Sequence, residues 1–137
     1  MTRSRIRFLA SLAMLGLAAA GPATIDAPLD GMAGDPVRGE AVVTRQSSTC
    51  VLCHAGPFAN PHLQGDVGPD LHGVGARLSV GQLRAQLVDA RRVNPDSVMP
   101  SFYRSEGLTR VGANWQGKTI LSAAEIEDAV AYLATLK

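Results

Sequence analysis

Apolar residues recur at helical spacing in three stretches of the chain, and no stretch of useful length alternates apolar and polar residues as a strand would. The most regular stretch lies at the carboxyl end, where one helical face carries Ile126, Ala129, Val130, Leu133 and Leu136. Ser122 and Glu125 precede this stripe with the spacing of a capping box, and Tyr132 lies beside it. The pattern predicts a terminal helix that packs on another element.

A second helix is predicted earlier in the chain, with Ser79 as its N-cap and its end before the Asn94-Pro95 pair. Its apolar positions share one face and comprise Val80, Leu83, Leu87 and Val88. The polar residues of the same stretch fall elsewhere on the helix. Arg84, Gln86 and Asp89 are therefore expected to face away from the core.

The first helix is predicted to have Asp35 as its N-cap and Pro36 at the first helical position, where the missing N–H group costs nothing. It should end near Thr44. Gly39 has no side chain and leaves room for another helix to cross closely. Between this helix and the second one, repeated Gly and Pro residues exclude any element longer than a turn. The predicted class is all-α, with one domain over residues 35–137.

The amino-terminal end has the pattern of a secretory signal peptide over residues 1–20, with three arginines before an apolar run at residues 8–20. The run is shorter than the roughly 20 residues that cross a bilayer, which disfavours an uncleaved anchor. Residues 21–34, rich in Pro, Gly and Ala, are interpreted as a flexible leader or a strap against a partner. The predicted product is periplasmic and has no membrane span after cleavage.

Cleavage also changes the charge balance. Losing three of the 13 basic residues leaves ten against 12 acidic ones, a net charge of −2, because the first 20 residues contain no acidic residue. A nearly neutral chain argues against nucleic acid as the partner.

The motif that carries chemistry is Cys50-Val51-Leu52-Cys53-His54. Two thiols three positions apart can bond to the two vinyl groups of a haem while His54 meets the iron from one face. A thioredoxin-like dithiol is disfavoured because strands and helices do not alternate around the motif, and a zinc site lacks further ligands. A disulfide across so short a loop would be strained. A covalent haem also accounts for both cysteines of the chain in an oxidising compartment, and would fill a core that has few aromatic residues.

The second axial ligand decides whether such a haem transfers electrons, binds gas or does chemistry. Beyond the signal segment the candidates are Met32, Met99, His62 and His72. Met99 is favoured because it lies 45 residues after His54, behind a full helix, and precedes a proline that favours an extended backbone. The alternative for Met99 is a gap-filling place in the core. A His/Met iron has both axial positions filled, which favours electron transfer over catalysis or gas sensing.

The haem motif, the run Gly68-Pro69-Asp70-Leu71, the loop at residues 94–100 that carries Met99 (the Met loop) and the terminal helix together resemble the class I cytochrome c fold over essentially the whole mature chain. More specifically, the stretch RRVNPDSVMPSFYR at residues 91–104 resembles the monohaem SoxX subunits of the SoxAX cytochromes of bacterial sulfur oxidation. So do GLTRV at residues 107–111 and EDAVAYL at residues 127–133. The resemblance implies that the Pro69 carbonyl accepts the Nδ1–H of His54, and that the first helix crosses the last at Gly39 and Tyr132.

The resemblance also implies a role in an enzyme. SoxAX cytochromes join thiosulfate to a cysteine of the SoxYZ carrier in an oxidative conjugation that releases two electrons. The catalytic haem lies on the larger SoxA subunit, so this chain would have no catalytic residue of its own. It would receive the electrons on its haem c and pass them to a downstream cytochrome c. The alternatives are a free-standing soluble electron shuttle and a gas-sensing haem domain.

Other residues have weaker expectations. By analogy with small cytochromes, Arg77 and Trp115 are candidates for hydrogen bonds to haem propionates, with ordinary surface or core places as the alternative. Phe102 and Tyr103 are expected in the haem pocket, or otherwise at a subunit contact. Four arginines flank the Met loop and would either steer an anionic partner or form a solvated face: Arg91, Arg92, Arg104 and Arg110.

Overall fold

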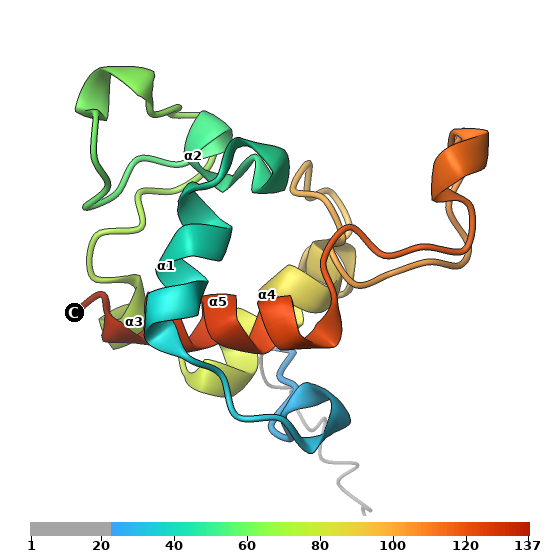
Figure 1. Ribbon diagram of the computed structural model, residues 1–137, viewed down its shortest axis with the longest axis horizontal. Coiled ribbons are helices and arrows are strands. Elements are labelled where there is room, and N and C mark those ends of the chain that lie inside the picture. Colours follow the sequence, from blue (N-terminus) through green and yellow to red (C-terminus); the bar gives the residue numbers. More distant parts are fainter. Residues whose placement is uncertain (1–22) are drawn as a thin grey trace, which may run out of the picture.

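The computed structural model describes residues 23–137 and is helical in all its regular elements, which confirms the all-α class (Figure 1). The predicted signal segment, residues 1–20, lies outside the described residues. The α-helices are α1 Pro36–Thr44, α2 Cys50–Cys53, α3 Val74–Arg77, α4 Val80–Val93 and α5 Ala123–Thr135. Short 3₁₀ turns lie at η1 Leu29–Gly31, η2 Gln46–Ser48, η3 Pro61–Leu63 and η4 Ala113–Trp115. In the part of the chain that is described, no helix is both long and apolar enough to cross a membrane.

The three predicted helices begin where their capping residues stand. Asp35 accepts hydrogen bonds from two backbone N–H groups of the first turn of α1, at 2.8 and 3.1 Å. Ser79 and Ser122 each form a full capping box, with Gln82 and Glu125 as their respective partners. These signals are local, so they mark the helix starts without reference to tertiary contacts.

Helix α1 crosses α5 in close contact (Figure 1), as predicted from Gly39. A Cβ atom built on Gly39 would lie 1.9 Å from the carbonyl oxygen of Asp128 and 2.7 Å from the Cβ of Tyr132. The Asp128 carboxylate also accepts the backbone N–H of Asp35 at 2.7 Å and binds the guanidinium of Arg38 through both oxygens at 2.8 Å. The crossing therefore depends on one missing side chain and one carboxylate.

Helix α4 corrects one expectation. Arg84 and Asp89 are 3% and 6% exposed, and Gln86 lines an internal cavity, so none of the three faces away from the protein interior as predicted. Arg84 pairs with the carboxylate of Glu127 on α5 through two bonds of 2.7 and 2.9 Å. Periodicity assigned these residues to solvent because it contains no information about partners on other elements.

Residues 24–34, here called the N-terminal strap, lie against α4 and α5 of the same chain. The N–H of Ile25 donates to the carbonyl of Gly81 at 3.0 Å, and the N–H of Leu29 donates to Glu127 Oε1 at 2.9 Å. Arg84 Nη1 donates to the carbonyl of Ile25 at 2.6 Å. The segment interpreted as a leader or a strap against a partner therefore has binding groups for its backbone on its own domain.

Residues 104–119, the outer arm, project away from the helices and carry η4 (Figure 1). The base of the arm is closed by the carbonyl of Phe102, which accepts the N–H groups of Ile120 and Leu121 at 2.9 and 3.0 Å. Trp115 on η4 is 57% exposed. The arm thus leaves the domain between the Met loop and α5 without closing over the interior.

Candidate cofactor site

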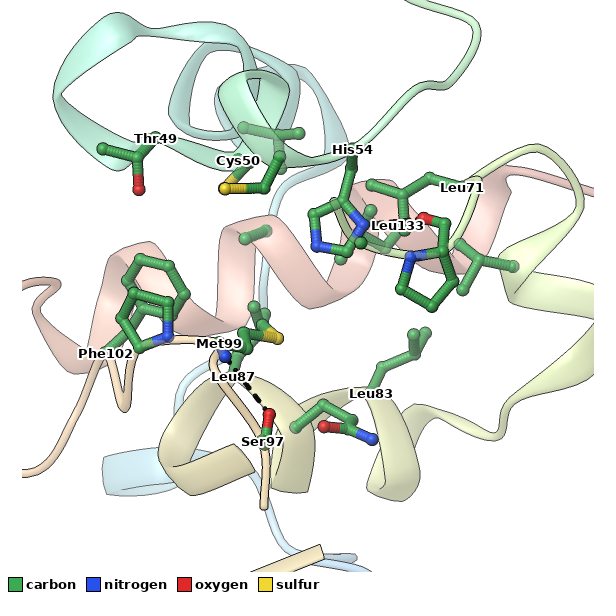
Figure 2. Close-up of a pocket in the computed structure, with 18 of the residues that line it drawn as sticks. Thr49, Cys50, His54, Leu71, Leu83, Leu87, Ser97, Met99, Phe102 and Leu133 are labelled. Atoms are coloured by element: carbon green, nitrogen blue, oxygen red, sulfur yellow. Dashed lines mark hydrogen bonds between the residues drawn. The ribbon is translucent and has the colours of Figure 1, made fainter. Parts of the chain in front are cut away.

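The interior contains a mostly apolar cavity of about 600 Å³. Figure 2 shows α2 along one wall, with α4 and the Met loop opposite and α5 behind. The volume is within the range of cavities that hold small molecules and cofactors. The cavity is lined by the residues predicted to bind haem, and it lies between the predicted helices.

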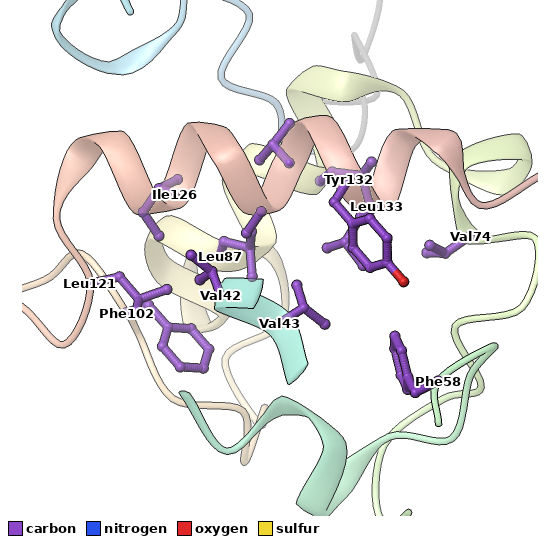
Figure 3. Close-up of a cluster of buried hydrophobic side chains, with 13 residues drawn as sticks. Val42, Val43, Phe58, Val74, Leu87, Phe102, Leu121, Ile126, Tyr132 and Leu133 are labelled. Atoms are coloured by element: carbon purple, nitrogen blue, oxygen red, sulfur yellow. The ribbon is translucent and has the colours of Figure 1, made fainter. Parts of the chain in front are cut away.

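The cavity is bordered by side chains of the hydrophobic core, which Figure 3 shows. The same side chains pack against the core and line the cavity wall, among them Val42, Val43, Leu87, Phe102, Leu121 and Leu133. A flat apolar group in the cavity would therefore complete the core. This agrees with the low aromatic content of the sequence.

Both cysteines line the cavity from the single turn of α2. Thr49 enters this turn in the left-handed region at φ 61°, so the chain reverses sharply before Cys50. Cys50 and Cys53 are free thiols in the structure. Burial raises the pKa of the Cys50 thiol.

His54 follows α2 directly, and Figure 2 shows its ring directed into the cavity. Its Nδ1 lies 2.7 Å from the carbonyl oxygen of Pro69, so Nδ1 carries the proton and donates it to that carbonyl. The Nε2 atom is then the basic nitrogen that remains for a metal ion. Gly68 allows this arrangement, because a Cβ on it would lie 2.3 Å from the His54 Cε1.

Met99 lines the same cavity from the wall opposite His54 (Figure 2). Its N–H donates to the Ser97 hydroxyl at 3.2 Å, and the N–H of Ser97 donates to the carbonyl of Asn94 at 3.0 Å. These bonds fold the end of α4 into a turn that brings the thioether back over the cavity. The structure thus brings together the residues predicted to bind haem, from segments 45 positions apart in the chain.

Of the competing axial candidates, neither histidine lines the cavity. His72 is exposed and paired with the Asp70 carboxylate at 2.7 Å, and His62 lies on η3. Met32 borders a separate, smaller pocket beside the N-terminal strap. Only Met99 among these candidates reaches the space in front of His54.

The weaker expectations have mixed outcomes. Phe102 lines the cavity, whereas Tyr103 packs against the core from outside the lining. Arg77 also lines the cavity, and it donates to the carbonyls of Asp70 and His72. Trp115 lies on the outer arm, away from the lining, so the propionate contact suggested for it has no support in the structure.

Two contributions to the site were not predicted from the sequence. Gly68 makes room for the His54 ring, and Asp89 binds the segment that follows Met99. The run Gly68-Pro69-Asp70-Leu71 was part of the pattern that carries the family resemblance, but the space that Gly68 leaves for the His54 ring was not predicted. Asp89 was placed on the wrong face.

The family model for cytochrome c matches residues 37–137. The chain belongs to the cytochrome c family. Its structure is similar to a chain in the crystal structure of SoxXA from P. pantotrophus, with a TM-score of 0.76 and 34% sequence identity. The match covers 87% of this chain and 93% of that chain, and it confirms the predicted resemblance to SoxX and the class I cytochrome c fold. No curated protein sequence matches the chain.

Family membership and the cysteine pair together make a covalently attached haem c the cofactor of this cytochrome. The site fits such a group in two independent respects. The cavity is apolar, and the only two cysteines of the sequence face it from one turn of helix.

Proposed function

We propose that this cytochrome holds its haem between His54 and Met99 and works as the electron-accepting subunit of a SoxAX-type heterodimer. The observation that carries the proposal is the placement of His54 and Met99 on opposite walls of one apolar cavity that Cys50 and Cys53 also line. Haem iron with an imidazole and a thioether ligand exchanges single electrons and leaves no open position for a substrate. The protein would supply the two ligands, orient His54 through Pro69 and surround the haem with a mostly apolar lining.

The proposed reaction is the oxidative joining of thiosulfate to a cysteine of a SoxYZ-type carrier, with the chemistry on a larger SoxA-type subunit. The two electrons released would pass through this chain to a downstream cytochrome c. The similarity to a chain of SoxXA supports this assignment over that of a free-standing shuttle. The signal pattern of residues 1–20 supports a periplasmic location, and residues 35–137 form the proposed cytochrome domain.

The axial assignment is tested by comparing Met99→Ala with Met32→Ala in the haem-loaded protein. Met32 is the matched control because it is the only other methionine beyond the signal segment. Met99→Ala should abolish the weak near-infrared band of thioether-ligated ferric haem and allow the ferrous protein to bind carbon monoxide. Met32→Ala should do neither. If the band persists in Met99→Ala, another residue holds the iron.

The subunit assignment is tested by co-expression with the larger haem protein of the same organism. We expect a stable heterodimer in which thiosulfate and the carrier protein reduce the haem of this chain. A chain that stays monomeric in the presence of that partner, yet still exchanges electrons with small cytochromes, would instead support the free-standing shuttle.

A further inference from the structure

Helix α4 is interrupted at Asp89, one turn before its end. Asp89 has φ −157° and ψ 91°, an extended conformation inside an otherwise helical stretch. Its side chain is buried, and the residue is 6% exposed. A buried carboxylate is stable only if charged or polar groups bind it. The partners of Asp89 therefore show which segment the interruption of α4 serves to bind.

Those partners all come from the segment that follows Met99. The Ser101 hydroxyl donates to Asp89 Oδ1 at 2.6 Å, and Arg104 Nη1 lies 3.5 Å from Oδ2. Both carboxylate oxygens are thus directed at the four residues that lead out of the Met loop. Ser101 is separated from Met99 by Pro100 alone, whose missing N–H leaves no backbone donor between them.

The backbone around the interruption binds the same segment. The carbonyls of Leu87 and Val88 accept the N–H groups of Phe102 and Tyr103, at 3.0 and 3.3 Å. Continuous helical hydrogen bonding needs helical φ and ψ at every residue, and the extended Asp89 breaks it where these two carbonyls lie. One interruption therefore supplies two backbone acceptors and one carboxylate to the chain beyond Met99.

The Met loop is thus fixed on both sides of its thioether. The turn through Ser97 fixes the approach to Met99, and Asp89 fixes the exit through Ser101. A thioether is a weak ligand, so its bond to iron is stable only if forming the bond costs the loop little conformational entropy. Loss of either attachment would leave the thioether bond in competition with loop motion.

We propose that Asp89 is a positioning residue that holds the Met99 thioether over the iron by binding Ser101. The inference rests on the proposed axial role of Met99. Removing the carboxylate makes the state without the bond between thioether and iron easier to reach. Small ligands then bind more readily at the axial position of the iron that Met99 leaves. Loss of a hydrogen bond to a charged group shifts such an equilibrium by about 10- to 100-fold.

The test is imidazole binding to the ferric, haem-loaded chain, followed by the change in its visible (Soret) absorption, a signal that remains usable in Met99→Ala. Asp89→Asn removes the charge but keeps an oxygen that can accept from Ser101, so it should bind imidazole about 5- to 10-fold more tightly than the unaltered protein. Asp66→Asn is the matched control, because Asp66 is exposed and lies outside the cavity lining. Unchanged imidazole affinity in Asp89→Asn would overturn the proposal.

A general loosening of the fold is separated from positioning by repeating the substitution in the Met99→Ala background. There the iron position is already open, so Asp89→Asn should leave imidazole affinity unchanged. An equal gain in both backgrounds would show that Asp89 does not act through Met99.

Ser101→Ala is the second variant, usable even if Asp89→Asn does not fold. It should tighten imidazole binding in the same direction, and an affinity equal to that of the unaltered protein would count against the proposal.

Failure of this inference and failure of the axial assignment give different results. If Met99→Ala retains the near-infrared band, the axial assignment fails and the inference with it. If Met99→Ala loses the band while both Asp89→Asn and Ser101→Ala bind imidazole like the unaltered protein, only the positioning role of Asp89 is wrong.

Discussion

Replacing Gly39 by Ala tests the helix crossing on which the whole arrangement depends. The new Cβ would lie 1.9 Å from the carbonyl oxygen of Asp128 and 2.7 Å from the Cβ of Tyr132. Ordinary contact begins at 3.4 Å, so the first of these distances is short by 1.5 Å. Neither neighbour can rotate away, because one is backbone and the other is fixed to it. The two helices must therefore separate.

Two effects of opposite sign determine the free energy of unfolding of this variant. Alanine in a helix interior is favoured over glycine by about 0.5–1 kcal/mol. Forcing an extra carbon into a well-packed interface typically costs about 1–3 kcal/mol, and sometimes more. An overlap of 1.5 Å against backbone atoms belongs at the upper end, and separation also lengthens the bonds from α1 to the Asp128 carboxylate. We expect a net loss of about 2 kcal/mol.

Urea unfolding of the haem-loaded chain, followed by far-ultraviolet circular dichroism, measures this loss. Gly112→Ala is the matched control, since nothing lies within 4 Å of its added Cβ and its φ of −58° suits any residue. That variant should be unchanged or more stable by up to about 1 kcal/mol. An unfolding midpoint of Gly39→Ala equal to that of Gly112→Ala would refute the steric argument.

Three further predictions concern the site and the buried charges. Gly68→Ala places a Cβ 2.3 Å from the His54 Cε1 and should displace that ring, which visible spectra of the ferric protein would detect as a change of ligation; an unaltered spectrum would contradict the contact. Glu127→Gln leaves the buried Arg84 without its counter-charge and should cost about 3–5 kcal/mol in urea unfolding, with no loss expected if the pair were solvated. A hydrogen bond from the Arg38 guanidinium holds the pKa of the Asp128 carboxyl below its usual 3.8. The contribution of this carboxylate to stability is therefore complete above pH 3.8 and is lost as the pH falls through the lower pKa of the folded state. The urea midpoint of Asp128→Asn should therefore fall less between about pH 4 and pH 2 than that of the unaltered chain. An equal fall of the two midpoints with pH would contradict this.

The predicted helices were confirmed because their signals are local. A capping residue and the helix it begins are neighbours in the sequence, as Ser122 and Glu125 are, and the apolar stripe behind them needs no partner to be recognised. The cofactor motif is local for the same reason, since two thiols and an imidazole on one turn are chemically specific. Met99 was favoured for its distance along the chain from His54 and for the proline that follows it, and in the structure it lines the cavity.

The burial of charged residues could not be predicted in the same way. Arg84 has a helical position that periodicity assigns to solvent, and its counter-charge, Glu127, lies 43 residues away. Asp128 was predicted as part of a family motif without a structural role, although it binds the backbone N–H of Asp35, 93 residues earlier. Such pairings depend on the tertiary fold, whereas hydropathy patterns describe only one element at a time.

These buried carboxylates have a common geometric role. Asp128 binds the start of α1, Glu127 binds the N-terminal strap, and Asp89 binds the exit of the Met loop. Each one joins α4 or α5 to a segment from elsewhere in the chain. A buried ion pair is weak support for stability, because desolvation offsets much of its attraction. These groups instead determine which sides of α4 and α5 face the cavity. The carboxylates occupy the sides that do not face it, so the apolar sides remain available to enclose the haem.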